Sequence, residues 1–262
     1  MLEDFDLTGK RVLITGAGRG IGKGIAFAMA EAGADVGVTS LGGDSAVEVA
    51  QGVRELGRKG FGWAADATKV APMQELRDRA FAELGGVDVL INCLGDAIRG
   101  SIAAMPGVEG HVLTEADWHH VIDVNLTQTY VGCNVFGPHL LAKGKAANVI
   151  NISSFAALRP GAGMVAYASG KTGLTRFTES LALEWAPFGV RVNAIAPGVF
   201  PDFYAMSDEE AKQRLEAPQQ GVPLNRVGHP REVGLLAVYL ASDAASYVTG
   251  QTFAIDGGRT LL

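Results

Sequence analysis

A tyrosine and a lysine four residues apart, Tyr167 and Lys171, could carry proton-transfer chemistry. Residues at this spacing lie on one face of a helix, so the phenol and the ammonium can point into the same cleft. The pKa of a free tyrosine is about 10, and lowering it to about 7 takes about 4 kcal/mol of preferential stabilisation of the phenolate. A nearby lysine cation can supply that stabilisation. Such a phenol could give a proton to a carbonyl oxygen or take one from an alcohol, although a surface pair without a role would have the same spacing.

A glycine-rich segment near the beginning of the chain could bind a phosphate group. Residues 15–22 read TGAGRGIG, so Gly16, Gly20 and Gly22 form the pattern TGxxxGxG, and the stricter GxGxxG pattern is absent. Glycines let the backbone turn sharply and approach a pyrophosphate, and the helix that follows offers free N–H groups and the positive end of its dipole. A tight turn without a ligand is the alternative, but a position between a strand and a helix favours phosphate binding.

These residues lie at the ends of short apolar runs that alternate with amphipathic segments. The predicted strands span residues 11–15, 35–39, 60–64, 87–92, 148–153, 191–196 and 252–255. The predicted helices span residues 20–32, 45–56, 72–84, 115–136, 164–188 and 229–240. The alternation indicates an α/β fold, a doubly wound, Rossmann-like parallel sheet with helices on both faces. We expect one domain over residues 1–262, with ligands bound at the carboxyl ends of the strands.

Composition excludes several other classes of protein. The 262 residues carry a net charge of −6 without a dense basic stretch, which argues against a nucleic-acid surface. Cys93 and Cys133 lie far apart and the histidines have no ligand spacing, so neither a disulfide scaffold nor a metal site is predicted. The acidic beginning does not resemble a signal peptide, and no apolar run is long enough to span a membrane. We therefore expect a cytoplasmic protein without membrane or nucleic-acid partners.

Taken together, the motifs resemble the short-chain dehydrogenase/reductase family over nearly the whole chain. The turn at Gly16 is similar to the family's phosphate turn, and Asp66 matches its adenine-contacting aspartate. The sequence Asn-Cys-Leu-Gly at 92–95 stands where the family usually has Asn-Asn-Ala-Gly, so two of the four positions differ. The segment 255–258, IDGG, resembles the family's C-terminal signature. The resemblance implies a nicotinamide-dependent oxidoreductase.

The resemblance also implies a set of catalytic residues. Ser154 stands thirteen residues before Tyr167, as in the family, and would hold the substrate oxygen in line with the phenol; Ser153 is the near alternative. Asn125 matches the family asparagine that supports a water near the lysine, and a buried amide bonded to its own helix would suit the same position. The predicted catalytic residues are Asn125, Ser154, Tyr167 and Lys171.

The resemblance implies a set of residues that contact the dinucleotide, most of them at the carboxyl ends of the predicted strands and two, Tyr167 and Lys171, on the predicted helix 164–188. They are Gly16, Arg19, Gly20, Ile21, Gly22, Ser40, Asp66, Ala67, Asn92, Gly95, Tyr167, Lys171, Pro197, Gly198 and Val199. Sites that take NAD usually have an acidic residue at the end of the second strand, where this chain has Ser40. Arg19, in the phosphate turn, could bind a 2′-phosphate. We therefore predict NADP as the cofactor, while NAD stays possible if Arg19 faces solvent or the pyrophosphate.

Two segments are expected to form the substrate pocket. Residues 96–117 are rich in loop-forming residues and could border the pocket or be a surface insertion. Residues 199–223 contain Phe200, Phe203, Tyr204 and Met206, which could form an apolar wall or a lid, and Asp202 stands where the family often has threonine. The acidic run at 208–210 predicts a solvent-exposed helix start.

The main hypothesis is an oxidoreductase that passes hydride between NADP(H) and a small-molecule secondary alcohol or ketone. A dinucleotide-binding sensor without catalysis is the alternative, and an extended sugar epimerase would need a further substrate domain. On the helix 164–188, Phe177, Leu181, Trp185 and Phe188 recur at core spacing. Because family members usually associate through this helix, we expect a homo-oligomer, a dimer or a tetramer.

Overall fold

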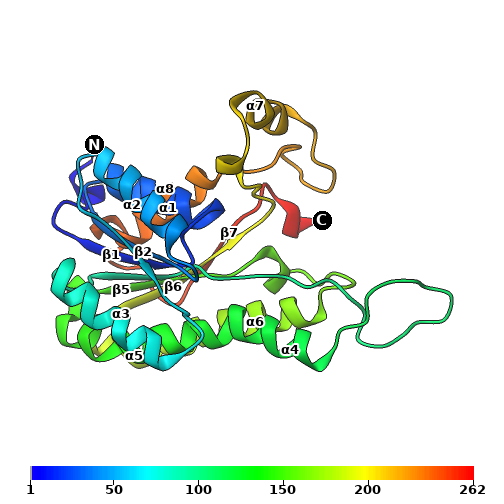
Figure 1. Ribbon diagram of the computed structural model, residues 1–262, viewed down its shortest axis with the longest axis horizontal. Helices are drawn as coiled ribbons and strands as arrows, with labels where there is room; N and C mark the ends of the chain where they lie inside the picture. Colours follow the sequence, from blue (N-terminus) through cyan, green and yellow to red (C-terminus); the bar gives the residue numbers. More distant parts are fainter. Residues whose placement is uncertain (1) are drawn as a thin grey trace.

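Seven parallel strands form one sheet at the centre of the computed structural model, which describes residues 2–262 (Figure 1). The strand order is β3-β2-β1-β4-β5-β6-β7, so the chain reverses direction across the sheet between β1 and β4. The strands are β1 (Arg11–Thr15), β2 (Asp35–Ser40), β3 (Gly60–Ala64), β4 (Val89–Asn92), β5 (Asn148–Ile152), β6 (Arg191–Pro197) and β7 (Thr252–Ile255). This order confirms the predicted doubly wound fold, and the gap between the ends of β1 and β4 is the switch point where ligands bind.

Helices cover both faces of the sheet, as Figure 1 shows. One face packs against α1 (Gly20–Glu31), α2 (Asp44–Glu55) and α8 (Pro230–Ala241). The other packs against α3 (Val70–Glu83), α5 (Gln128–Lys143) and α6 (Val165–Trp185). Every residue of β4 and β5 is buried, as expected for central strands covered on both faces. The two apolar layers fix the strand ends relative to one another.

The segment predicted as one helix over 115–136 is divided in the structure. The first part is α4 (Glu115–Ile122), which begins at a capping box between Thr114 and Asp117. A π-helical turn, Asp123–Thr127, follows, and α5 then continues to residue 143, seven residues past the predicted end. Inserted π turns are frequent at functional sites, and this one contains Asn125.

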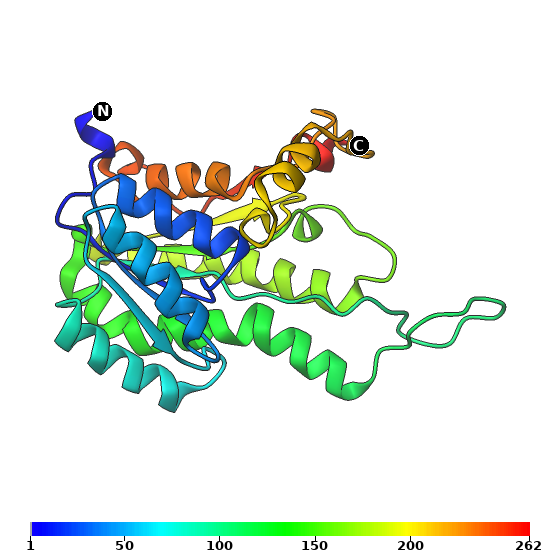
Figure 2. The same cartoon turned by 45° about the horizontal axis from the view of Figure 1, so that its top comes forward.

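Two segments project from the body. Residues 101–112, which we name the arm, extend away from the sheet with only two isolated β-bridges, Ser101 to Val112 and Met105 to Val108 (Figure 2). Residues 199–228, which we name the lid, carry α7 (Asp208–Glu216) above the carboxyl end of the sheet (Figure 1). The predicted helix start at 208 is confirmed, with Ser207 and Glu210 forming its capping box. Within residues 2–262, no helix is both long and apolar enough to cross a membrane.

Candidate active site

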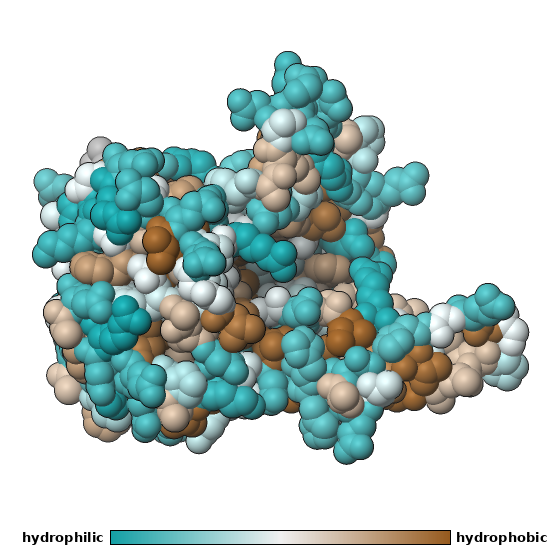
Figure 3. Space-filling view, viewed as in Figure 1, coloured by the Kyte–Doolittle hydropathy of each residue, from teal (hydrophilic) through white to brown (hydrophobic). Residues whose placement is uncertain are grey.

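A continuous groove crosses the carboxyl ends of the strands at the switch point. It consists of a cavity of about 510 Å³ on the β5 and β6 side and another of about 460 Å³ on the β2 and β3 side. Both are lined by Gly16, Arg19, Leu94, Gly95 and Asp96. Figure 3 shows the surface hollowed between the projecting lid and the base of the arm. The groove therefore has the position that the fold predicts for a dinucleotide.

The phosphate turn leaves its backbone open to this groove. A Cβ on Gly16 would lie 2.9 Å from Leu94 Cα, and one on Gly22 would lie 2.6 Å from Ala17 Cα, so neither position has room for a side chain. At Gly20, which has a φ of +51°, a Cβ would meet only the carboxyl carbon of Asp202, 3.9 Å away. Gly20 is the first residue of α1. Its N–H belongs to the first turn, whose donors have no partner within the helix. This arrangement fits an anionic pyrophosphate.

The cavity beside β2 and β3 fits the adenosine end of a dinucleotide. Ser40, Asp66 and Ala67 line it, as predicted. The Ser40 hydroxyl accepts a hydrogen bond from Gly43 N at 3.1 Å, which closes the turn after β2. Arg19 is exposed and borders both cavities, and Lys69, which was not predicted, adds a second cation beside Asp66. The end of β2 carries no carboxylate.

Ser154 and Tyr167 meet in the cavity beside β5 and β6. Ser154 lies two residues past the end of β5, and its hydroxyl accepts a hydrogen bond from Ala156 N at 3.1 Å, which fixes the serine at the start of a short 3-10 turn. Tyr167, in the first turn of α6, lies close enough to Ser154 for the serine hydroxyl to lower the pKa of the phenol, and packs against Leu113 and Val121. Burial raises the pKa of Tyr167, and the Ser154 hydroxyl only partly offsets this rise. The direction of this shift is opposite to the lowering that the sequence predicted for a phenol beside Lys171.

The position of Lys171 explains why the pKa of Tyr167 is not lowered as predicted. Its side chain is 2% exposed, and its Nζ donates to the Ile152 carbonyl at 2.8 Å. The Nζ lies 6.0 Å from the centre of the Tyr167 ring, so the two side chains share the cavity while the ammonium is held by the end of β5. Burial also lowers the pKa of Lys171 to about 8. Lys171 is therefore not among the groups that lower the pKa of Tyr167 in this arrangement.

Ser153, the alternative to Ser154, has other partners. Its hydroxyl lies 3.2 Å from the Lys171 carbonyl and 3.1 Å from Thr175 Oγ1, so it bonds to the helix α6. Both serines line the cavity, but of the two it is the Ser154 hydroxyl that lowers the pKa of Tyr167. The contacts thus favour Ser154 as the residue that faces a substrate.

Asn125 is held by the π turn beside the lysine. Its amide donates to the carbonyl of Val121 at 2.8 Å and to that of Asp96 at 2.6 Å, so the predicted bond to its own helix is present. Its Oδ1 is buried without a hydrogen-bond partner in the described chain. A Cβ on Gly95 would lie 3.0 Å from both Asn125 Oδ1 and Lys171 Nζ. The glycine therefore keeps open a small polar space between these two side chains.

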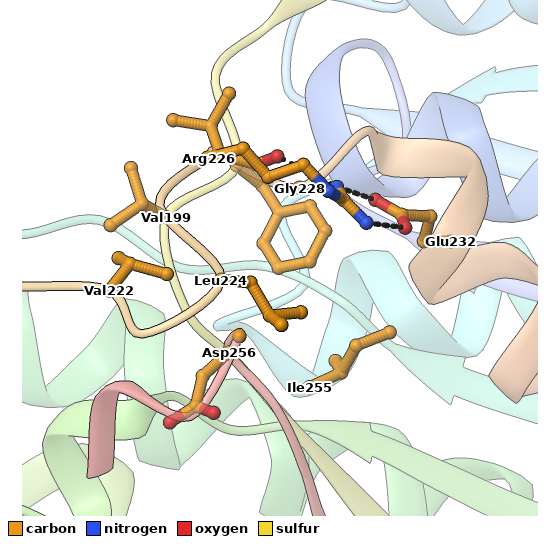
Figure 4. Close-up of a pocket in the computed structure, with 11 residues that line it drawn as sticks. Val199, Val222, Leu224, Arg226, Gly228, Glu232, Ile255 and Asp256 are labelled. Atoms are coloured by element: carbon orange, nitrogen blue, oxygen red, sulfur yellow. Dashed lines mark hydrogen bonds and ion pairs between the residues drawn. The ribbon is translucent and has the colours of Figure 1, made fainter. Parts of the chain in front are cut away.

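Two residues predicted to touch the dinucleotide lie elsewhere. Asn92 is fully buried beneath the groove, where its amide donates to Asn151 Oδ1 at 2.8 Å and joins β4 to β5. Val199 lines a separate cavity of about 80 Å³ at the base of the lid, together with Ile255 and Asp256 (Figure 4). Both lie next to residues that do face the groove. Their positions near a strand end therefore could not distinguish them from residues that contact the dinucleotide. The other predicted residues all line one of the two groove cavities.

The substrate end of the groove includes residues that the sequence did not single out. Arg99, Phe155 and Met164 line it, and Phe200 is the one predicted lid aromatic that does. Phe203 and Tyr204 pack instead against His229 and Phe27, which are outside the groove. Of the segment 96–117, only the residues next to β4 and the base of the arm border the groove.

The other candidate reactive groups do not form a site. No group of three or more His, Cys, Asp or Glu residues within positions 2–262 could hold a metal ion. His119 and His120 are exposed. Burial raises the pKa of both Cys93 and Cys133 to about 12, which disfavours their thiolates at neutral pH. The prediction that Phe188 lies in the core is wrong, because this residue is 58% exposed.

Comparison with known proteins gives matches over almost the full length. A family model described as enoyl-(acyl carrier protein) reductase matches residues 16–260. Glucose 1-dehydrogenase 2 of Bacillus subtilis (strain 168) is 36% identical over 260 residues, which cover 98% of this chain and 96% of that protein.

Solved structures of other dehydrogenases also match the chain over almost its full length. A gluconate 5-dehydrogenase from Burkholderia cenocepacia J2315, in complex with NADP and tartrate, superposes with a TM-score of 0.86 at 30% identity, covering 100% of this chain and 99% of the other. A 7α-hydroxysteroid dehydrogenase in complex with NADH and 7-oxo glycochenodeoxycholic acid gives a TM-score of 0.84 at 30% identity, covering 97% and 96%. These relatives act on different molecules and hold different dinucleotides.

Proposed function

Because the chain belongs to the short-chain dehydrogenase/reductase family, we propose that it passes hydride between NADP(H) and a secondary alcohol or ketone, with Tyr167 as the general acid and base. The chain is an enzyme of the nicotinamide-dependent oxidoreductases that act on CH–OH and C=O groups. The observation that carries the proposal is that Ser154, Tyr167 and Lys171 meet in one cavity that also contains the phosphate turn.

The side chains of this cavity suit proton transfer to a carbonyl oxygen. A substrate oxygen between Ser154 and Tyr167 would accept hydrogen bonds from both hydroxyls, which orients the carbonyl. Because burial raises the pKa of Tyr167, the phenol is protonated at neutral pH and can donate its proton as the oxygen gains negative charge. Lys171 then stabilises the phenolate that remains and supplies the proton that restores the phenol. The open space beside Asn125 Oδ1 could hold a water that replaces the proton the lysine has given up.

The groove fits the dinucleotide that this chemistry needs. The glycine backbone at the phosphate turn would hold the pyrophosphate, and Ser40, Asp66 and Ala67 would border the adenosine. Pro197 and Gly198, at the end of β6, would lie against the nicotinamide side. When bound, the nicotinamide ring supplies or accepts the hydride.

We infer a preference for NADP from the charges at the adenosine end. Ser40 leaves the end of β2 without a carboxylate, while Arg19 and Lys69 line the same cavity. A guanidinium can bind a phosphate through two parallel hydrogen bonds. The Kd values of NADP and NAD, measured directly on the purified protein, test the preference. An equal or tighter Kd for NAD would overturn it.

We further propose that one domain spanning the chain carries both the dinucleotide and the small-molecule substrate, and that the protein is a dimer or tetramer. The exposed apolar side chain of Leu183, on the outer face of α6, supports a second copy as the partner. The relatives act on unlike substrates, and Arg99 at the substrate end of the groove does not by itself select one alcohol.

The decisive variant is Tyr167→Phe, which removes the hydroxyl and keeps the ring. We expect turnover of ketones with NADPH to fall by about 10³-fold, because general acid catalysis contributes about that much, while the Kd of NADPH stays unchanged. Tyr247→Phe, at a fully exposed tyrosine, is the control and should keep full turnover. Unchanged turnover in Tyr167→Phe would overturn the proposed role, and a wild type that binds NADPH but reduces nothing in a broad screen would favour the sensor.

A further inference from the structure

Asp202 of the lid contacts the phosphate turn, although the two are far apart in sequence. Its Oδ1 accepts a hydrogen bond from Gly20 N at 3.1 Å, across 182 residues of sequence. The N–H groups of the first helical turn have no partner inside the helix and carry the positive end of its dipole. A carboxylate therefore occupies one of the donors that the turn would offer to a pyrophosphate.

The position of Asp202 is fixed by the residues that follow it. Phe203 is buried and stacks on His229, with ring centres 5.1 Å apart. Tyr204 packs edge-on against Phe27 of α1 at 5.8 Å, and Lys23 of the same helix lies 5.2 Å from the centre of its ring. The beginning of the lid is thus attached to the helix whose amino end Asp202 contacts, so the hydrogen bond belongs to a packed arrangement.

The base of the lid is also closed. Gly228 N donates to the Val199 carbonyl at 2.9 Å, which joins the two ends of the segment. Arg226 forms two hydrogen bonds with the carboxylate of Glu232 in α8, shown by the dashed lines in Figure 4. The backbone is therefore attached on both sides of Asp202, and this side chain can leave Gly20 N by rotation about its own bonds while the lid keeps its attachments.

We propose that Asp202 competes with the cofactor's pyrophosphate for the amino end of α1, so that binding displaces this carboxylate and is weakened by it. This inference rests on the proposed function. The charges support it: the cavity around the phosphate turn has the carboxylates of Asp96 and Asp202 close to where a doubly charged pyrophosphate would lie. Like charges at short range in a partly buried groove repel strongly. A neutral threonine, as the family often has here, would avoid that repulsion.

Direct binding measurements on Asp202→Asn and Asp202→Thr test the proposal without turnover. We expect the Kd of NADP to fall by about tenfold or more in both variants, because one repulsive charge is removed. The difference from wild type should shrink at high salt, which screens the repulsion. Adenosine 2′-monophosphate, which lacks the pyrophosphate, should bind all three proteins within about twofold, since Asp202 lines only the cavity away from the adenosine end.

Asp208→Asn is the matched control, because Asp208 is an exposed aspartate of the same lid, on α7. It should leave the Kd of NADP unchanged. A Kd for NADP that is unchanged or raised in Asp202→Asn would overturn the inference, the latter because it would show that Asp202 holds the cofactor. If wild type and variants bind neither NADP nor NAD, the proposed function itself is overturned.

Discussion

Burial disfavours the charge of Lys171. The residue is 2% exposed, and within the described chain its ammonium hydrogen-bonds to the Ile152 carbonyl alone. A lysine in this state can exchange a proton near neutral pH more readily than one at the surface. Its value for catalysis and its effect on folding are therefore two consequences of the same burial.

Because Lys171 is buried, the free energy of unfolding should depend on pH. The pKa of Lys171 falls from its usual 10.5 to about 8 in the folded chain, so folding releases its proton between these two pH values. The wild type should gain stability as the pH rises from 8 to 10.5, by up to about 3 kcal/mol, and Lys171→Met should not show this gain. Urea unfolding of both proteins between pH 8 and 10 measures the difference.

Lys212→Met, at an exposed lysine of α7, provides the comparison and should follow the wild type at every pH. A constant difference in unfolding free energy between Lys171→Met and wild type over this range would show that the lysine is not desolvated as the structure indicates.

At the scale of the elements, one buried carboxylate joins three of them at the end of the sheet opposite to the groove. Asp88 precedes β4 and is 4% exposed. Its oxygens accept hydrogen bonds from Arg11 N and Nε of β1, both at 2.8 Å, and pair with Lys143 at the end of α5. Burial alone would raise the pKa of Asp88, but the hydrogen bonds from Arg11 and Lys143 lower it overall.

Asp88→Asn should destabilise the fold, because it leaves two cations without their counter-charge. Breaking a buried pair costs about 3–5 kcal/mol, and about 2–3 kcal/mol is expected here since the partners keep some contact with water. The lowered pKa means that this contribution is present above pH 3.8 and is lost as the pH falls through the folded-state pKa. Denaturant unfolding at pH 7 and pH 3 measures both effects.

Asp78→Asn, which changes an exposed aspartate paired with Arg77, should cost less than about 0.5 kcal/mol. If Asp88→Asn is no less stable than Asp78→Asn at pH 7, the cluster does not hold these elements together.

The elements themselves were largely predictable, because a buried parallel strand must be apolar along its length and a helix behind it must be apolar on one side. Six of the seven predicted strands match within one residue at each end, and β4 begins two residues late. The π turn was not predicted. Its residue Asn125 hydrogen-bonds to the Asp96 carbonyl, 29 residues away, a contact that local spacing does not reveal.

Part of the candidate site could likewise be predicted from the sequence, and part could not. Tyr167, Lys171 and the phosphate turn are readable because their chemistry lies in local spacing. The burial that raises the pKa of the tyrosine and the contact of Asp202 with Gly20 arise from packing between distant segments, and local spacing carries no trace of either.

For the molecule as a whole, the sheet places the reacting groups at the carboxyl ends of its strands and leaves the outer helices free for association. Leu183, on α6, is 80% exposed, and Tyr130, on α5, is 51% exposed. Large apolar side chains on neighbouring outer helices of one face are typical of surfaces that a second copy covers. The groove opens on a different side, at the strand ends.

Leu183→Glu should therefore shift the proposed dimer or tetramer toward smaller species while the circular dichroism spectrum stays unchanged, because a charge in an apolar interface is costly. Light scattering after size-exclusion chromatography measures the mass. Val47→Glu, at a half-exposed valine of α2 on the opposite face, is the control and should keep the wild-type mass. A wild type that runs as a monomer would contradict the expected assembly.

The hydrogen bond between Gly228 and the Val199 carbonyl has a consequence for how such an enzyme can diversify. Because the lid leaves and rejoins the body at adjacent points, residues 205–221, beyond the packed Phe203 and Tyr204, can be lengthened, shortened or exchanged while the register of β6 and the start of α8 stay the same. Mutations that accumulate there can change how the lid covers the groove at little risk to folding. The segment is a natural place for one ancestral scaffold to acquire a new substrate, and for a laboratory selection to search for one.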